Sequence, residues 1–334
     1  MIVGLGSLLV ILGLAALVLW RFARWRNAAY ERVKTGSEVA RTARGPVEYA
    51  MTGEGPVVLV LHGGVGGFDQ GQFLGEDLRI HESFTLLAPS RAGYLRTPLE
   101  TCRTPQETAD ALAALLDVLD IREVAVVGIS GGGPIALQMA LRHPDRVRAL
   151  VMLVAVSRRF VLPSRSTRGV GRVFFSNTGM WLVDLMCWLV FVGTLRVRPA
   201  LVATWFFKGS ETLDRAGIRQ RVAQFMADPD QIRWMRMLVD YLLPVSLRKT
   251  GMENDLRQFA AIDEYPVQRI ACPTLVIHGR HDGNVPFEHA DFVADGVPNA
   301  RLHVVEGCGH LVWLSERAKE VQSAVIGFLK EHSV

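Results

Sequence analysis

The hydrophobic positions along the chain fall into three patterns. Residues 2–20 (IVGLGSLLVILGLAALVLW) form one apolar run without a charged residue. Within 46–156, and again within 270–334, short β-branched runs alternate with segments of helical periodicity. Between 157 and 269 this alternation stops, and the sequence indicates helices rich in Trp and Arg. We therefore expect an anchor, a basic juxtamembrane neck at 21–45, a two-part body and an inserted helical cap.

Short apolar runs predict strands at 57–61, 84–88, 124–128, 149–154, 274–278 and 302–305, and those at 57–61 and 124–128 are expected to be buried in the sheet. A run at 47–51 followed by a turn predicts an antiparallel edge strand. Thr104-Pro105-Gln106-Glu107 is a capping box that begins a helix reaching about residue 120. Further helices are expected at 134–142 and 316–331. Strands alternating with helices favour the α/β class, with a mostly parallel sheet flanked by helices.

The N-terminal run has the length of a membrane span. As a helix, residues 2–20 are about 28 Å long, close to the ~30 Å hydrocarbon core of a bilayer. Trp20 ends the run and the cations Arg21, Arg24 and Arg26 follow it, whereas no cation precedes it. This pattern predicts an uncleaved single-pass transmembrane helix with the catalytic body in the cytoplasm. A cleaved signal peptide, which would have cations before the run, and a buried core helix are the alternatives.

The net charge of +4 is unevenly distributed. Residues 1–45 carry +5, residues 157–270 carry +7, and the remainder carries −8. A basic neck and a basic insertion on an acidic body differ from the continuous basic groove of a nucleic-acid binder, so no nucleic-acid partner is expected. The four cysteines lie far apart without a C-x-x-C pair, which argues against a zinc site or a disulfide scaffold.

Ser130 is the candidate nucleophile. Gly128-Ile129-Ser130-Gly131-Gly132 fits the pattern G-x-S-x-G between a predicted buried strand and a predicted helix. Such a tight turn forces the serine into strained backbone angles, which only small flanking residues tolerate. The start of the helix places N–H donors beside developing negative charge. A solvated serine in a glycine-rich turn is the alternative.

A serine nucleophile needs a base that is itself oriented by an acid. Asp282 follows the strand at 274–278, and His310 follows the strand at 302–305. In a parallel sheet these strand ends converge on the edge that carries Ser130. His278 and His281 are weaker candidates for the base, because His310 fills the expected position.

The sequence His62-Gly63-Gly64-Val65-Gly66-Gly67 follows the strand at 57–61. Glycines let backbone N–H groups approach a substrate oxygen closely. The N–H groups of Gly64 and Gly131 are therefore the predicted oxyanion hole. A phosphate-binding loop is the alternative, but G-x-G-x-x-G and G-x-x-x-x-G-K-[ST] are absent here, and neither a cofactor nor a metal is expected.

In combination, these motifs resemble the α/β-hydrolase superfamily over about residues 45–332. The matching segments are HGG at 62–64, GISGG at 128–132, HDGNVP at 281–286 and GCGH at 307–310. The resemblance implies the branch with an H-G-x oxyanion loop and a helical cap between the sixth and seventh strands. Pro89-Ser90-Arg91-Ala92-Gly93-Tyr94 matches the family's D-x-R-G-x-G loop, except that Ser90 replaces the usual aspartate. Dehalogenases and epoxide hydrolases of the family use an aspartate nucleophile, so Ser130 points away from those reactions.

The cap offers candidate substrate-binding residues. Trp181 and Trp188 lie in a strongly apolar segment at 180–197 and are expected to line an acyl pocket or to rest on lipid. Packing of the cap onto the core is the alternative explanation. A second membrane span is a further alternative, although Asp184 near the bilayer middle would be costly.

The sequence therefore predicts a membrane-anchored serine hydrolase that cleaves small, lipophilic carboxylic esters. Residues 2–20 would bind the lipid bilayer, and Ser130, His310 and Asp282 would form the catalytic triad. The same triad also fits a thioesterase, an amidase or a hydrolase of C–C bonds. A non-catalytic ligand-binding protein on a hydrolase scaffold is the alternative from another class.

Overall fold

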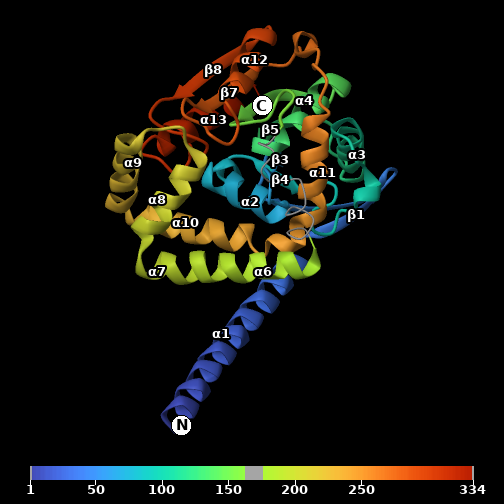
Figure 1. Ribbon diagram of the computed structural model, residues 1–334. Helices are drawn as coiled ribbons and strands as arrows, with labels where there is room; N and C mark the ends of the chain where they lie inside the picture. Colours follow the sequence, from blue (N-terminus) through green and yellow to red (C-terminus); the bar gives the residue numbers. More distant parts are fainter. Residues whose placement is uncertain (1, 162–175, 333–334) are drawn as a thin grey trace.

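The computed structural model describes residues 2–161 and 176–332; the part of the predicted cap at 162–175 lies outside the described residues. Within the described residues, eight strands form one sheet in the order β1-β2-β4-β3-β5-β6-β7-β8 (Figure 1). The strands are β1 (Glu38–Thr42), β2 (Gly45–Thr52), β3 (Val57–Leu61), β4 (Thr85–Pro89), β5 (Val124–Ile129), β6 (Val147–Leu153), β7 (Thr274–Gly279) and β8 (Ala300–Val305).

The sheet is parallel from β4 to β8, which confirms the predicted α/β class. The pairs β1–β2 and β2–β4 are antiparallel. The prediction that the strand at 47–51 lies at an edge was wrong, because β1 pairs along β2 and takes the outer position. The sequence of β1, EVART, has one buried side chain, Ala40, so it carries little hydrophobic signal.

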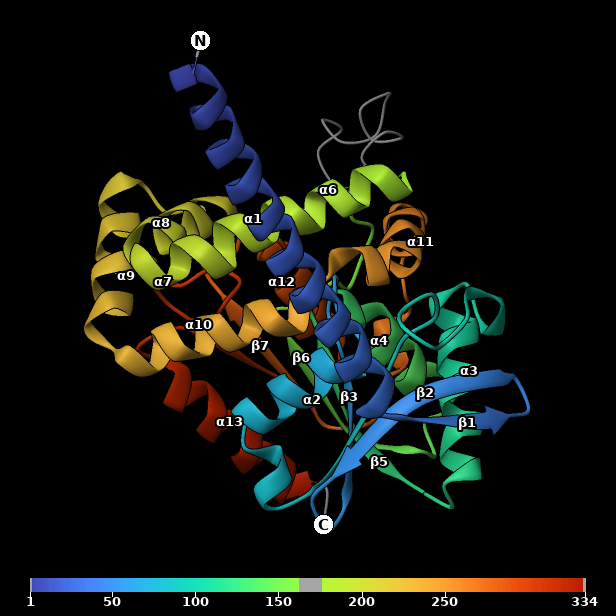
Figure 2. The same ribbon diagram turned by 90° about the horizontal axis from the view of Figure 1, so that it is seen from below.

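Helices cover both faces of the sheet (Figures 1 and 2). Along β3, Val58 and Val60 belong to one apolar cluster, and Leu59 and Leu61 belong to the other. Alternation of side chains along a strand explains this division. One face packs against α2 (Phe68–Asp77) and α13 (Ala318–His332), and the other packs against α3 (Pro105–Val118), α4 (Gly133–Arg142) and α12 (Glu288–Gly296).

The predicted capping box of α3 is present. Thr104 Oγ1 accepts a hydrogen bond from the Glu107 amide at 3.1 Å, and the Glu107 carboxylate accepts one from the Thr104 amide at 3.1 Å. Pro105 begins the helix, where its missing N–H costs no hydrogen bond.

Between β6 and β7 the described part of the cap is helical. Its elements are α6 (Asn177–Cys187), a π-helical stretch at Trp188–Thr194, α7 (Leu195–Val197), α8 (Pro199–Ser210), α9 (Arg215–Ala227), α10 (Pro229–Leu242), a 3₁₀ turn at Val245–Arg248 and α11 (Lys249–Ala260). Figure 1 shows α6 and α7 as one nearly continuous rod along the side of the body from which α1 projects.

Helix α1 spans Ile2–Thr35 and therefore runs from the predicted anchor into the predicted neck. Its first half projects away from the body (Figures 1 and 2). Its second half packs on the body, with Phe22, Ala29 and Val33 buried.

Among the described residues, the helical segment Asn177–Val197 is long and apolar enough to span a membrane by length and composition. Its Asp184 is fully buried and accepts a hydrogen bond from the Ser246 amide at 3.1 Å. The Ser246 hydroxyl also donates to Asp184, at 2.5 Å, and Arg26 Nε lies 3.5 Å from the carboxylate. These contacts attach the segment to the 3₁₀ turn at Val245–Arg248 and to α1.

Candidate active site

Ser130 lies at the sharp turn between β5 and α4. Its φ of 51° is in the left-handed region, which a side chain adopts at an energetic cost. The turn leaves no room for side chains on its glycines. A Cβ on Gly128 would lie 2.6 Å from the Ala136 Cβ, and one on Gly132 would lie 2.4 Å from the Leu61 carbonyl oxygen. The turn therefore requires glycine at both positions and presents the Ser130 hydroxyl at the end of the strand.

His310 links Ser130 to Asp282. His310 Nε2 is 3.0 Å from Ser130 Oγ, and His310 Nδ1 is 2.7 Å from Asp282 Oδ2. Asp282 follows β7 and His310 follows β8, so the carboxyl ends of parallel strands bring the groups together. The structure thus assembles the three side chains predicted from the sequence. A carboxylate on Nδ1 fixes the proton there and leaves the Nε2 lone pair facing the hydroxyl.

The carboxylate of Asp282 is tightly held. Its Oδ1 accepts hydrogen bonds from the amides of Asn284 and Val285, each at 2.8 Å. Its Oδ2 also lies 3.3 Å from His278 Nε2. Burial alone would raise the pKa of Asp282, but the neighbouring imidazoles of His310 and His278 outweigh it and hold the pKa below its ordinary value. Asp282 therefore stays ionised, as an acid that orients a histidine must.

The glycine-rich loop after β3 lies against Ser130. A Cβ on Gly63 would be 3.1 Å from the Ser130 Cβ, and a Cβ on Gly131 would be 3.2 Å from the Gly64 nitrogen. The two amides that the sequence predicts as oxyanion donors, Gly64 and Gly131, are therefore close neighbours beside the serine. Such a pair can stabilise an oxyanion that forms on a carbonyl attacked by Ser130.

Comparison with known families is consistent with this geometry. The family profile described as the alpha/beta hydrolase fold matches residues 56–316, which is more than half of the chain. The chain belongs to the α/β-hydrolase family.

Several hydrolases are similar to this one over most of their length. An uncharacterized hydrolase of Bacillus subtilis strain 168, YcgS, is 29% identical over 289 residues, covering 86% of this chain and 95% of that protein. The 2-hydroxymuconate semialdehyde hydrolase of Pseudomonas putida is 27% identical over 281 residues, covering 84% and 89%. A solved alpha/beta hydrolase fold protein from Nakamurella multipartita is 33% identical, with a TM-score of 0.76 and coverage of 88% and 99%.

In this α/β-hydrolase, Arg91 holds the glycine-rich loop after β3 from behind. The Arg91 guanidinium donates to the carbonyls of His62 and Gly63 at 3.1 and 3.0 Å, and the Arg91 amide donates to His62 Nε2 at 3.0 Å. In a trans peptide the carbonyl and the following N–H point in opposite directions. Because the Gly63 carbonyl faces Arg91, the Gly64 N–H faces away from it.

Asp255 of cap helix α11 neutralises Arg91. Its two carboxylate oxygens accept from the guanidinium at 2.8 and 2.7 Å, and Tyr94 donates to Asp255 Oδ2 at 2.6 Å. Arg91 is 3% exposed, so the pair is desolvated. Sequence reasoning missed this pair because its members are 164 residues apart. The pair connects the cap to the backbone of the glycine-rich loop after β3.

Replacing Asp255 with asparagine is expected to lower the free energy of unfolding by about 3 kcal/mol, because it leaves the Arg91 charge buried and unpaired. We also expect a fall in kcat of roughly tenfold or more, because Arg91 then positions the Gly64 amide less accurately. Urea unfolding and steady-state kinetics measure both effects. Tyr94→Phe is the matched control, since it removes one hydroxyl from the same carboxylate and should cost about 1 kcal/mol. Equal effects of the two substitutions would contradict this role for the ion pair.

Ser90 replaces the aspartate that the family loop usually carries, and the structure shows what takes over its bonding. Ser90 Oγ accepts from the Phe68 amide at 2.9 Å and donates to Glu48 Oε2 at 2.7 Å. The fully buried Glu48 on β2 also accepts from the Arg96 amide and side chain at 2.9 and 2.7 Å. A carboxylate from the neighbouring strand therefore anchors this loop.

A second cap segment holds the loops of Asp282 and His310. Glu211, just after α8, forms a backbone bridge with Asp282, and its side chain receives Arg221 at 3.2 Å. Burial raises the pKa of Glu211, although Arg221 partly opposes the shift. A Cβ on Gly309, next to His310, would lie 2.4 Å from the Glu211 Cγ. The cap thus directly contacts the two loops that carry Asp282 and His310.

The predicted substrate-binding tryptophans lie at the junction of the cap and α1. Phe22 of α1 stacks edge-on against Trp181, with ring centroids 5.5 Å apart, and its ring is 5.7 Å from that of Trp188. Both tryptophans are half-buried. These contacts give them a packing role, and their contact with substrate stays a prediction.

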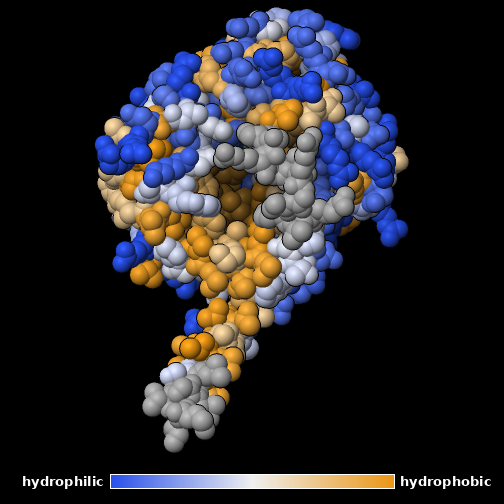
Figure 3. All heavy atoms as spheres, viewed as in Figure 1, coloured by the Kyte–Doolittle hydropathy of each residue, from blue (hydrophilic) through white to orange (hydrophobic). Residues whose placement is uncertain are grey.

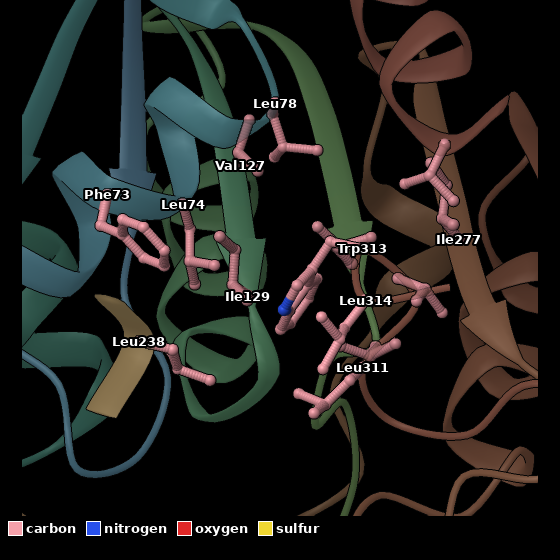
Figure 4. Packing of buried hydrophobic residues seen from close by; sticks show 14 of the residues in the cluster. Phe73, Leu74, Leu78, Val127, Ile129, Leu238, Ile277, Leu311, Trp313 and Leu314 are labelled. Atoms are coloured by element: carbon pink, nitrogen blue, oxygen red, sulfur yellow. The ribbon is translucent and has the colours of Figure 1, made fainter. Parts of the chain in front are cut away.

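Trp313 is an aromatic neighbour of His310 that sequence reasoning missed. Its ring centroid is 6.4 Å from that of the imidazole, and the residue is 7% exposed. Figure 4 shows the indole directed toward Ile129 at the end of β5, with Leu311 and Leu314 of the same loop beside it. It therefore packs the His310 loop against the strand that carries Ser130.

His289 on α12 fixes the start of the cap. Its Nδ1 accepts from the amides of Ser157 and Arg158 at 3.1 and 3.3 Å, so this nitrogen must be unprotonated. Burial, together with the neighbouring His278 and Arg158, lowers the pKa of His289 to about 4. The neutral imidazole is therefore the form that the native structure needs.

The lowered pKa of His289 predicts acid destabilisation. Below pH 6.5 the unfolded chain binds a proton at this histidine that the native state refuses, so stability falls as pH falls from 6.5 toward 4. Between pH 7.5 and 5.5 this effect amounts to about 1.3 kcal/mol. Urea unfolding at both pH values measures it. In His289→Asn, whose amide oxygen can accept the same N–H groups without titrating, the pH dependence should be smaller by this amount. An unchanged pH dependence of stability in His289→Asn would show that His289 does not cause the acid destabilisation.

Proposed function

We propose that this hydrolase cleaves carboxylic esters through an acyl-enzyme on Ser130. His310 takes the Ser130 proton as the hydroxyl oxygen attacks the ester carbonyl, and Asp282 holds the imidazole orientation. The amides of Gly64 and Gly131 stabilise the resulting oxyanion. His310 then protonates the leaving alcohol, and a water activated by the same histidine releases the acid. The continuous relay from Asp282 through His310 to Ser130 is the observation that carries this proposal.

Lipophilic esters suit the apolar cap best. A labelling experiment and a substrate series test the reaction together. A fluorophosphonate probe should label Ser130, and p-nitrophenyl esters should be hydrolysed, with kcat/KM rising from short to longer acyl chains. Absence of labelling in a folded sample would argue against a serine nucleophile and favour a ligand-binding role for the scaffold.

Hydrolysis of C–C bonds is the second candidate. It is favoured by the similarity to 2-hydroxymuconate semialdehyde hydrolase over 84% of the chain. Ser130, activated by the same His310 and Asp282, can attack a ketone carbonyl instead of an ester carbonyl. Probe labelling without turnover of esters, combined with cleavage of a 2-hydroxy-6-oxo-dienoate, would favour this reaction. Thioesters and amides should be included in the same series, since they also proceed through an acyl-enzyme.

We also propose that residues 2–20 anchor the protein in a bilayer, with the body on the cytoplasmic side. The apolar side chains described between Leu9 and Trp20 are exposed, although water disfavours such a surface. Arg21 and Arg24 follow on the side of the body, as expected for a cytoplasmic flank.

Removal of residues 2–19 tests the anchor. This deletion retains Phe22 and the buried half of α1, so the body should stay folded and label with the probe. The full chain should remain in membranes after a carbonate wash, and the shortened chain should be released. Release of the full chain would contradict the anchor, whereas retention of the shortened chain would indicate a span at Asn177–Val197.

A further inference from the structure

The outer side of the cap carries a group of exposed apolar side chains next to α1. We call them the cap face: Leu182, Met186, Leu189, Val190, Val197, Leu201 and Trp205. On the rod formed by α6 and its π-helical continuation, members are spaced by about one helical turn and therefore share one side. Figure 3 shows apolar residues gathered where α1 leaves the body, beside a hollow in the surface.

Within residues 177–210, which carry the cap face, the exposed charges have one sign. Between residues 177 and 210 the acidic residue is Asp184, which is fully buried. The basic residues of the same segment, Arg196, Arg198 and Lys208, are exposed. An apolar face bordered by cations is complementary to an anionic lipid surface, in which apolar side chains enter the interface and cations meet headgroups.

The cap face also lies close to the point along α1 where the apolar run ends. Phe22, which contacts Trp181 and Trp188 of the rod, is two residues past Trp20, or about 3 Å farther along the helix axis. The apolar run of α1 ends at Trp20. If that run crosses the hydrocarbon core, the rod lies at the membrane interface, where Trp side chains are favoured.

The contacts of Asp184 favour a rod that lies along this interface over one that crosses the bilayer. A crossing would remove Asp184 from Ser246 and from Arg26 and place its carboxylate among lipid chains, at a high energetic cost. Lateral contact with the interface leaves these bonds intact and covers the exposed apolar side chains.

We propose that the cap face is a docking surface for an anionic lipid bilayer, which seats the cap in the interface beside the α1 anchor. This inference rests on the proposed anchoring by α1. Lipophilic substrates dissolved in the bilayer then meet the enzyme on the side that carries the cap face.

Spin labels at three exposed positions test the proposal in the full chain, reconstituted in vesicles of phosphatidylcholine and phosphatidylglycerol. The background is Cys187→Ser/Cys272→Ser, because Cys102 and Cys308 are buried. Leu201→Cys reports the cap face, Leu14→Cys reports the anchor, and Val118→Cys on α3 is a matched control with 50% exposure against 58% for Leu201. Accessibility to oxygen relative to a water-soluble nickel complex shows whether each label lies in lipid or in water.

The ratio of oxygen to nickel accessibility is expected to be several-fold higher at Leu201 and Leu14 than at Val118. A lipid-exposed Leu14 label together with a water-exposed Leu201 label would overturn the docking surface and leave the anchor standing. A water-exposed Leu14 label would overturn the anchor and the inference with it. A Leu201 label shielded from both reagents would assign the cap face to a second copy of the chain and would also overturn the proposal.

Steady-state kinetics of a charged substitution in the cap face give an independent test. Leu201→Glu should lower kcat/KM several-fold for a long-chain ester carried in the vesicles, since a carboxylate weakens docking to an anionic surface. The same variant should leave hydrolysis of a short, water-soluble ester unchanged, and Val118→Glu should change neither. Equal kcat/KM of Leu201→Glu and the unsubstituted enzyme on the long-chain ester would contradict the docking surface.

Discussion

Substitution of Ser130 by alanine is expected to reduce ester hydrolysis by roughly 10⁴- to 10⁶-fold, because the relay then has no nucleophile. Residual turnover would come from the oxyanion donors and from substrate binding alone. The substitution removes one hydroxyl from a half-buried residue. The alanine methyl group occupies the place of the serine Cβ, so the unfolding free energy should change by no more than about 1 kcal/mol.

Steady-state kinetics, probe labelling and urea unfolding should be measured on the same preparation. Ser83→Ala is a suitable control, because it removes a half-buried hydroxyl at the end of the 3₁₀ turn Ile80–Glu82. It should keep both activity and labelling. If Ser130→Ala stayed folded and retained activity within tenfold, another residue would have to be the nucleophile.

Asp282→Asn is expected to lower kcat by roughly 10⁴-fold. Asparagine has one carbonyl oxygen, and the amides of Asn284 and Val285 both donate to the present Oδ1. The carbonyl oxygen should keep these two bonds, so the amide NH₂ faces His310. A donor at that position favours the tautomer with the proton on Nε2, and this imidazole cannot accept the Ser130 proton.

Glu211→Gln provides the comparison for Asp282→Asn, since Glu211 is a buried carboxylate whose backbone bridges Asp282. It should reduce kcat far less, because its side chain pairs with Arg221. The reverse order, with activity kept in Asp282→Asn and lost in Glu211→Gln, would show that the acid was wrongly assigned. Probe labelling should also be measured at several pH values. The Asp282→Asn variant should react slowly with the probe even at pH 8, because its His310 has the wrong tautomer at every pH.

The sheet and the relay could be predicted because their signals are local. β3 is a run of five apolar residues that alternate between two cores, and it matches the predicted strand at 57–61. Ser130 stands in a short motif at a strand end, and Asp282 and His310 follow two further strands. Convergence of parallel strand ends then places all three together.

The elements and bonds that were missed depend on distant partners. Helix α2 was missed because its sequence, FDQGQFLGED, contains two glycines and few apolar residues. Its Gly75 packs closely on Leu86, where a Cβ would lie 2.5 Å away, so the glycine reflects contact with β4. Glu48 and Ser90 are 42 residues apart, and neither sequence segment reveals that one completes the bonding of the other.

The buried pair Arg91–Asp255 limits how this enzyme can be engineered. A chimera that receives the cap of a relative would exchange Asp255 while keeping Arg91 in the body. It would leave an unmatched cation behind the glycine-rich loop after β3 unless the donor cap brings its own carboxylate. The same exchange would remove Glu211 from the Gly309 backbone. The cap of this chain therefore cannot be exchanged as an independent module to alter the substrate range. A working graft must carry the cap together with the residues of the body that face it.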